Sequence, residues 1–146
     1  MRKAGLMAWA LVLGTASPQA HASAWIVGSG YNFIRQSAYV SLDYRKGQLA
    51  GEAFLMSMGG EEPTTNPGPE LSLDALGYLP WLPVFGKIGV VAGWKKYGEN
   101  IGCGVDLPIT HYWLLRLQDT FFHATEDQHR NPETENILSV GAHYRF

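Results

Sequence analysis

Apolar and polar residues alternate with a period of two along most of the chain. The last segment is the clearest case, because one parity is apolar throughout and the other, from Ser139 to Arg145, is polar or small. The apolar parity consists of Leu138, Val140, Ala142, Tyr144 and Phe146. Successive side chains of a β-strand point to opposite faces, so the pattern predicts a strand with one apolar face.

The same alternation recurs upstream, within residues 25–33, 38–45, 49–55, 71–79, 84–95, 100–107 and 113–118. Together these segments predict eight strands of roughly 8–12 residues, near the length that a tilted strand needs to cross a bilayer. An even number of strands is typical of bacterial membrane barrels. The sequence therefore predicts an all-β fold, an eight-stranded antiparallel up-and-down transmembrane β-barrel over residues 23–146.

The predicted connections alternate between short and long. Residues 45–47, 80–83 and 108–111 are rich in proline or glycine and predict tight turns. The longer connections are two polar loops, 59–69 and 123–135, with shorter loops around Arg35 and Tyr97. Short periplasmic turns and longer outer loops are usual for such barrels, so we expect both ends of the barrel domain in the periplasm.

The polar parity decides between a membrane barrel and a soluble β-sandwich or lipocalin-like barrel, whose apolar side chains would point inward. Eight ionisable residues fall on this parity: Asp43, Glu52, Asp74, Lys87, Asp106, Arg116, His143 and Arg145. Such a set suits a small lumen better than a solvated sandwich face. Aromatic residues also gather near the predicted strand ends, where a membrane barrel places its aromatic girdles.

Composition agrees with a surface that partly faces lipid. Charged residues make up 16% of the chain, aromatic residues 12%, and the formal net charge is -2. A nucleic-acid partner is not expected, because a phosphate-binding surface would need an excess of basic residues. The chain has one cysteine, Cys103, which excludes an intramolecular disulfide. No pattern predicts a metal site or a cofactor.

The first 22 residues have the order of a cleaved secretory signal peptide. Arg2 and Lys3 form a basic start, residues 6–14 form an apolar stretch too short to span a bilayer, and residues 20–22 form a small-x-small cleavage site. We therefore expect export and a mature protein that begins at Ser23. With the barrel prediction, this places the protein in the bacterial outer membrane, in contact with its lipid.

Several segments resemble the OmpA-like outer-membrane β-barrel family, a family of small porin-like transmembrane domains. Residues 102–110 with 115–118 are similar to the sixth and seventh strands of that domain. Residues 76–80 with 85–89 are similar to the fourth and fifth, and residues 138–146 to the last. The last strand also resembles the signature that the barrel assembly machinery recognises.

The resemblance implies a lumen packed by a network of charged side chains. Glu52, Asp106 and Arg116 match interior charged positions of the family, and Lys87 lies where a basic residue is frequent. Asp74 has the same inward parity, so we expect Glu52, Asp74, Lys87, Asp106 and Arg116 to form the network. Isolated charges in a narrow lumen would each cost several kcal/mol, which independently requires that they be paired.

Two residues depart from the family pattern. Ala75 stands where well-known members carry a lysine of the lumenal network. Asp119 occupies an outward position that is typically aromatic, which predicts that the seventh strand ends early or carries a bulge there.

Four functions remain open from the sequence. The barrel could be structural, it could bind an extracellular partner through loops 59–69 and 123–135, or it could be a gated pore. The fourth is a lipid A deacylase-like enzyme in which His123 and Thr125 replace a His-x-Ser pair and Glu133 or Glu135 orients the histidine. Thr125 is a weaker nucleophile than serine, so no catalytic residue is assigned and a structural or binding role is preferred.

Overall fold

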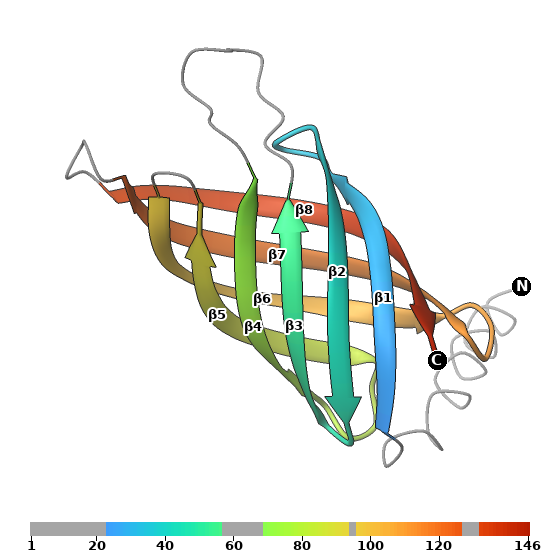
Figure 1. Ribbon diagram of the computed structural model, residues 1–146. Helices are drawn as coiled ribbons and strands as arrows, with labels where there is room; N and C mark the ends of the chain where they lie inside the picture. The colour runs from blue at the N-terminus through green and yellow to red at the C-terminus, as the bar shows by residue number, and fades with distance from the viewer. Residues whose placement is uncertain (1–22, 57–68, 94–95, 127–131) are drawn as a thin grey trace, which may run out of the picture.

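The protein is an all-β barrel of eight strands, shown in Figure 1. The computed structural model describes residues 23–56, 69–93, 96–126 and 132–146. The strands are β1 (Ser23–Asn32), β2 (Ser37–Lys46), β3 (Leu49–Met56), β4 (Glu70–Tyr78), β5 (Val84–Ala92), β6 (Lys96–Pro108), β7 (Trp113–Glu126) and β8 (Pro132–Arg145). The described residues contain no helix long and apolar enough to cross a bilayer.

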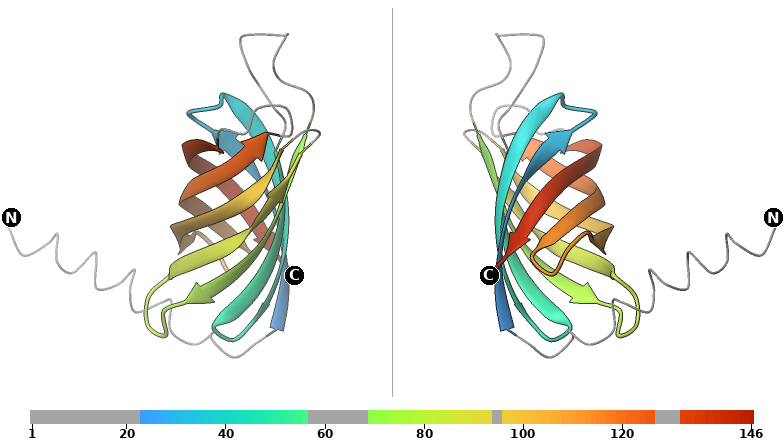
Figure 2. Two further views of the ribbon diagram at one scale, coloured as in Figure 1. Left: turned by 90° about the vertical axis from the view of Figure 1, so that its left-hand side faces the viewer. Right: turned by 90° about the vertical axis from the view of Figure 1, so that its right-hand side faces the viewer.

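Each strand pairs antiparallel with its neighbour in sequence, and β1 pairs with β8 to close the sheet. Figure 2 shows this closed wall from two sides. Closure leaves no sheet edge, so the strands can satisfy the main-chain hydrogen bonds of their neighbours around the whole ring. The predicted all-β fold with eight antiparallel up-and-down strands is confirmed.

The barrel has two unlike ends. The turn end holds Ser23, Phe146 and the connections at 47–48, 79–83 and 109–112. The first of these turns relies on Gly47, whose φ of 64° is a left-handed conformation that glycine adopts at no steric cost. At the loop end lie the β1–β2 loop, residues 33–36, and the strand ends Met56, Glu70, Ala92, Lys96, Glu126 and Pro132.

Alternation along the strands sorts the side chains as predicted. Along β4, the residues from Glu70 to Tyr78 alternate without a break between buried and exposed. The exposed residues are Leu71, Leu73, Ala75 and Gly77, so the outer wall here is apolar or small. The opposite parity points into the barrel, where it carries both charged and apolar side chains.

Three expectations about strand ends were wrong. β7 continues to Glu126 and β8 begins at Pro132, so most of the predicted loop 123–135 is strand. Asp119 neither ends β7 nor forms a bulge, because the pairing with β6 and β8 runs through it in unbroken register. Tyr97, expected in a loop, is a strand residue of β6. Polar residues lie on the outer face of these strand extensions, and their polarity had predicted loops.

Some expectations fall on residues that the structure does not describe. These are the predicted signal peptide, residues 1–22, and the loop 59–69 apart from Pro69. The segment 127–131, within the predicted loop 123–135, also lies outside the described residues.

The interior is layered along the barrel axis. An apolar cluster near the turn end contains Ala50, Leu76, Tyr78 and Phe85. A second apolar cluster near the loop end contains Tyr39, Phe54, Met56, Val91, Phe122 and Ile137. The order along β3 runs from Ala50 through the buried charge of Glu52 to Phe54. Charged side chains therefore occupy the middle layer, between two apolar ones.

Candidate functional site

Arg116 is the centre of the charged layer. It lies on β7 with none of its surface exposed, and its guanidinium contacts three carboxylates from three other strands. Nε donates to Asp106 Oδ1 over 2.7 Å, and Nη1 donates to Asp43 Oδ2 over 2.7 Å and to Glu52 Oε2 over 2.5 Å. A guanidinium suits this position because its donors form a planar fork that can serve several acceptors together.

Lys87 of β5 is the second cation of the layer. Its Nζ lies 3.0 Å from Glu52 Oε1 and 2.8 Å from Asp74 Oδ2. Glu52 therefore binds Arg116 with one oxygen and Lys87 with the other. This shared carboxylate joins the two cations into one network that reaches from β2 to β7.

Neutral side chains satisfy much of the remaining hydrogen-bonding capacity. Tyr78 donates its hydroxyl to Asp106 Oδ2 over 2.8 Å. Ser72 and the amide of Asn100 both donate to Asp74 Oδ1, over 2.6 and 2.9 Å. Buried carboxylates need such donors, because an oxygen that loses water and gains no partner raises the free energy of the folded state.

Aromatic rings border the charged layer on both sides. The Arg116 guanidinium lies 5.0 Å from the centre of the Phe85 ring, toward the turn end. Lys87 Nζ lies 5.0 Å from the centre of the Phe54 ring, toward the loop end. Both contacts are within the range of a cation–π attraction. The rings also exclude water from the charges and so strengthen each ion pair.

The predicted network is therefore brought together. Glu52, Asp74, Lys87, Asp106 and Arg116 are all buried and lie in one set of ion pairs. The inward-facing parity identified these five residues, but four further members of the network were not predicted: Asp43, Ser72, Tyr78 and Asn100. Asp43 was recognised as inward-facing and not assigned to the network. Ala75 faces outward on β4 and could not have joined it.

A second ion-pair group lies at the loop end, and no pattern in the sequence predicted it. Arg35, in the β1–β2 loop, donates from Nη1 to Glu70 Oε2 over 2.6 Å and from Nε to Glu135 Oε2 over 2.8 Å. Its guanidinium lies 5.7 Å from the centre of the Phe122 ring. Burial lowers the pKa of Arg35, but the hydrogen bond to Glu135 and the charge of Glu70 outweigh this effect and raise it. Arg35 is thus charged and ties the loop to β4 and β8.

The residues of the enzyme hypothesis lie on β7 and β8. His123 is exposed on the outer face, and its Nδ1 lies 3.3 Å from the hydroxyl oxygen of Thr134. Thr125 shares that face two residues further along. Glu135 pairs with the inward-facing Phe122 in register and binds Arg35, so its carboxylate is on the other side of the wall from His123. The side chain of Glu133 lies outside the described residues.

The chain closes on itself through the predicted terminal strand. Leu138, Val140, Ala142 and Tyr144 share the outer face of β8, as their parity predicted. Phe146 donates its main-chain N–H to the carbonyl of Trp25 over 3.0 Å and accepts one from the N–H of Trp25 over 3.2 Å. The last residue thus continues the seam between β1 and β8.

In the described part of the chain, no group of three or more His, Cys, Asp or Glu side chains could hold a metal ion. No protein-family model matches the chain, and a search of curated proteins finds no match either.

Proposed function

We propose that the protein is an integral β-barrel of a bacterial outer membrane, with a lumen that its own side chains fill. Its role in this proposal is to support the envelope or to present its connecting loops to a partner outside the cell. The resemblance of three parts of the sequence to OmpA-like barrels agrees with the proposal. So does the signal-like order of residues 1–22.

The observation that carries the proposal is that polarity is reversed relative to a soluble protein. The centre of the barrel holds buried ion pairs, whereas large apolar side chains cover the outside. Ile88, Val90 and Leu73 are more than half exposed, at 63%, 59% and 53%. A broad apolar surface on the outside of a barrel is costly in water and favourable in the hydrocarbon of a bilayer.

Aromatic residues at the turn end add a second observation. Trp25 contacts Tyr44 at a centroid separation of 4.9 Å, and Trp113 contacts Tyr144 at 5.1 Å. The strand pairing continues this row from β2 across β1 and β8 to β7. Amphipathic rings favour the boundary between acyl chains and headgroups, so the row supports a membrane interface at this level.

Fractionation with a gel-mobility assay tests the proposal. The full chain is expressed in a Gram-negative host, the inner and outer membranes are separated, and each fraction is run on a gel with and without boiling. We expect the protein in the outer-membrane fraction and a shift in mobility on boiling, because closed barrels resist detergent until heated. A protein found in the soluble periplasmic fraction, with one mobility in both samples, would refute the proposal.

We do not extend the proposal to hydrolase activity. A His–hydroxyl pair needs a third group that orients the histidine, and Glu135 lies across the wall from His123 and binds Arg35. Analysis of lipid A by mass spectrometry in expressing cells checks this choice. We expect an unchanged acyl pattern, and loss of an acyl chain that depends on His123 would overturn it.

A further inference from the structure

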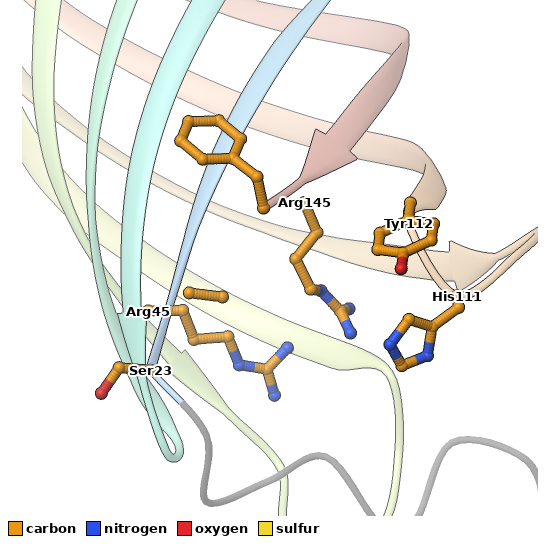
Figure 3. Close-up of a pocket in the computed structure, with 7 residues that line it drawn as sticks. Ser23, Arg45, His111, Tyr112 and Arg145 are labelled. Atoms are coloured by element: carbon orange, nitrogen blue, oxygen red, sulfur yellow. The ribbon is translucent and has the colours of Figure 1, made fainter.

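A pocket of about 240 Å³ opens at the turn end of the barrel. Residues from the ends of β1, β2 and β8 and from the 109–112 turn line it. Figure 3 shows Arg45 and Arg145 extending into the same space, with His111 and Tyr112 facing them from the turn. We propose that this pocket binds a phosphate ester.

Arg45 is held in place by contacts that leave most of its donors available. Its Nε donates to the carbonyl of Gly47 over 3.0 Å, and its guanidinium stacks 3.7 Å from the centre of the Tyr78 ring. Among the residues that the structure describes, no carboxylate pairs with Arg45. The guanidinium is thus fixed by a turn and a ring, and its Nη atoms can serve a ligand.

Arg145 brings a second positive charge to the pocket. It is the last residue of β8 and is half-buried; the charge of Arg45 acts on it unfavourably, and the charge of Asp106 in the charged layer acts on it favourably. Two like charges that line one half-enclosed space repel each other, and an anion placed between them removes that repulsion. No described side chain that lines the pocket is a carboxylate.

The remaining lining favours phosphate over a carboxylate. His111 and Tyr112 add a ring nitrogen and a hydroxyl to the two guanidiniums, so donors approach from both sides of the space. A tetrahedral phosphate has enough oxygens to accept from several of these directions, and arginine forks match its geometry. The volume is below that of pockets for drug-sized molecules and suits a headgroup-sized ligand.

Such a phosphate has two possible sources. It could belong to a soluble ester in the periplasm or to the headgroup of a phospholipid in the inner leaflet. Phe146 also lines the pocket, and its exposed ring lies beside the aromatic row of the turn end, so a lipid headgroup at that row would be near the pocket. This second source rests on the proposed membrane location, whereas the first does not.

The test uses the protein extracted from membranes into an uncharged detergent and stripped of lipid. In one arm, sn-glycerol 3-phosphate is titrated in a calorimeter. In the other, native mass spectrometry compares adducts of phosphatidylglycerol with those of phosphatidylcholine at equal lipid concentration. The variants are the double substitution Arg45→Gln and Arg145→Gln, and Lys46→Gln as the matched control, since Lys46 is an exposed cation on the same strand end.

We expect the double variant to bind at least about tenfold more weakly in the arm that shows binding, because two charge-assisted contacts are lost. Lys46→Gln should bind like the wild type. Binding of glycerol phosphate identifies a soluble ester, and preference for phosphatidylglycerol alone identifies the headgroup. The proposal is overturned if the wild type binds neither, or if the double variant binds as the wild type does.

Heat-modifiable mobility verifies that each variant is folded. Loss of the Arg45–Tyr78 stacking could unfold the double variant, so His111→Gln provides a second test. His111 lies in a turn and not in a strand of the barrel wall. The His111→Gln variant should weaken binding of the same ligand, and unchanged binding in both folded variants would overturn the proposal. A protein that fractionates as soluble and keeps its gel mobility on boiling would refute the membrane location. The glycerol phosphate arm would still decide whether the pocket binds a phosphate ester.

Discussion

Arg116 and Asp106 face each other across β7 and β6 and are joined by two parallel hydrogen bonds. Nε lies 2.7 Å from Oδ1, and Nη2 lies 2.9 Å from Oδ2. This two-bond geometry fixes the plane of the guanidinium, so that Nη1 points at Asp43 and Glu52. One cross-strand pair thus orients the cation on which three buried carboxylates depend.

Replacing Arg116 should be among the most damaging changes in the barrel. Arg116→Met removes the cation that three buried carboxylates share, of which Glu52 keeps a second one in Lys87. We expect it to lower the free energy of unfolding by about 3–5 kcal/mol. Urea unfolding in phospholipid vesicles, followed by tryptophan fluorescence, measures the loss. Lys46→Met, which removes an exposed cation, is the control and should change the value little. Equal midpoints for the two variants would contradict the role of Arg116.

Removing both partners should cost less than the sum of the single changes. We expect Arg116→Met combined with Asp106→Asn to recover about 0.5–3 kcal/mol relative to additivity, because the second change neutralises a carboxylate that the first left unpaired. The same urea experiment on the four proteins of the cycle measures this coupling. Strict additivity would show that the two side chains do not act on one another.

Replacing Asp119 distinguishes a wall that faces lipid from one that faces water. Asp119 is exposed on the outer wall, bonded weakly to Asn136 at 3.4 Å, and paired in register with Cys103 and Leu138. Six residues separate Asp119 from Trp113, a distance of about 15 Å along the barrel axis. Asp119 therefore lies near the middle of an apolar band of about 25 Å. Asp119→Leu should therefore raise the free energy of unfolding by about 1–2 kcal/mol in vesicles.

The control for Asp119 is Glu99→Leu, on the outer face near the loop end of β6. The cost of a lipid-facing charge falls toward the interface, so its gain should be smaller. No gain from Asp119→Leu, together with aggregation in aqueous buffer, would indicate that this wall faces water.

Close approach inside the barrel makes Gly141 difficult to replace. A Cβ there would lie 2.6 Å from the main-chain oxygen of Ser29 and would collide with the Tyr39 hydroxyl. Gly141→Ala should lower the free energy of unfolding by about 1–3 kcal/mol through overpacking. The control is Gly77→Ala on the outer face of β4, where a Cβ meets nothing within 4 Å and strand entropy should make the change neutral or stabilising. Equal unfolding curves would contradict the packing.

The layered interior predicts that the barrel does not conduct. Eight strands enclose a space that side chains can fill, and the charged layer lies between two apolar clusters. Planar bilayer recordings on purified, refolded protein should show no single-channel steps above the detergent background. Steps of uniform size that Arg116→Met abolishes or enlarges would contradict a filled lumen and favour the gated-pore hypothesis.

The sequence alone determined the strand count and the two faces of each strand. It also determined which charged residues face inward. The reason is geometric: side chains alternate at a period of two, so a run such as residues 71–79 assigns every residue to a face without reference to the rest of the chain. The inward charges of Glu52, Lys87 and Arg116 could be recognised in this way.

Only the tertiary structure decided which inward residues meet. Asp43 and Arg116 are 73 residues apart, and Arg35 and Glu135 are 100 apart. Their contacts depend on the register of several strand pairs and on closure between β1 and β8, none of which a local pattern encodes. The extent of β7 and β8 was also decided there, because cross-strand pairing keeps Asp119 and His123 in a strand that their polarity alone does not predict.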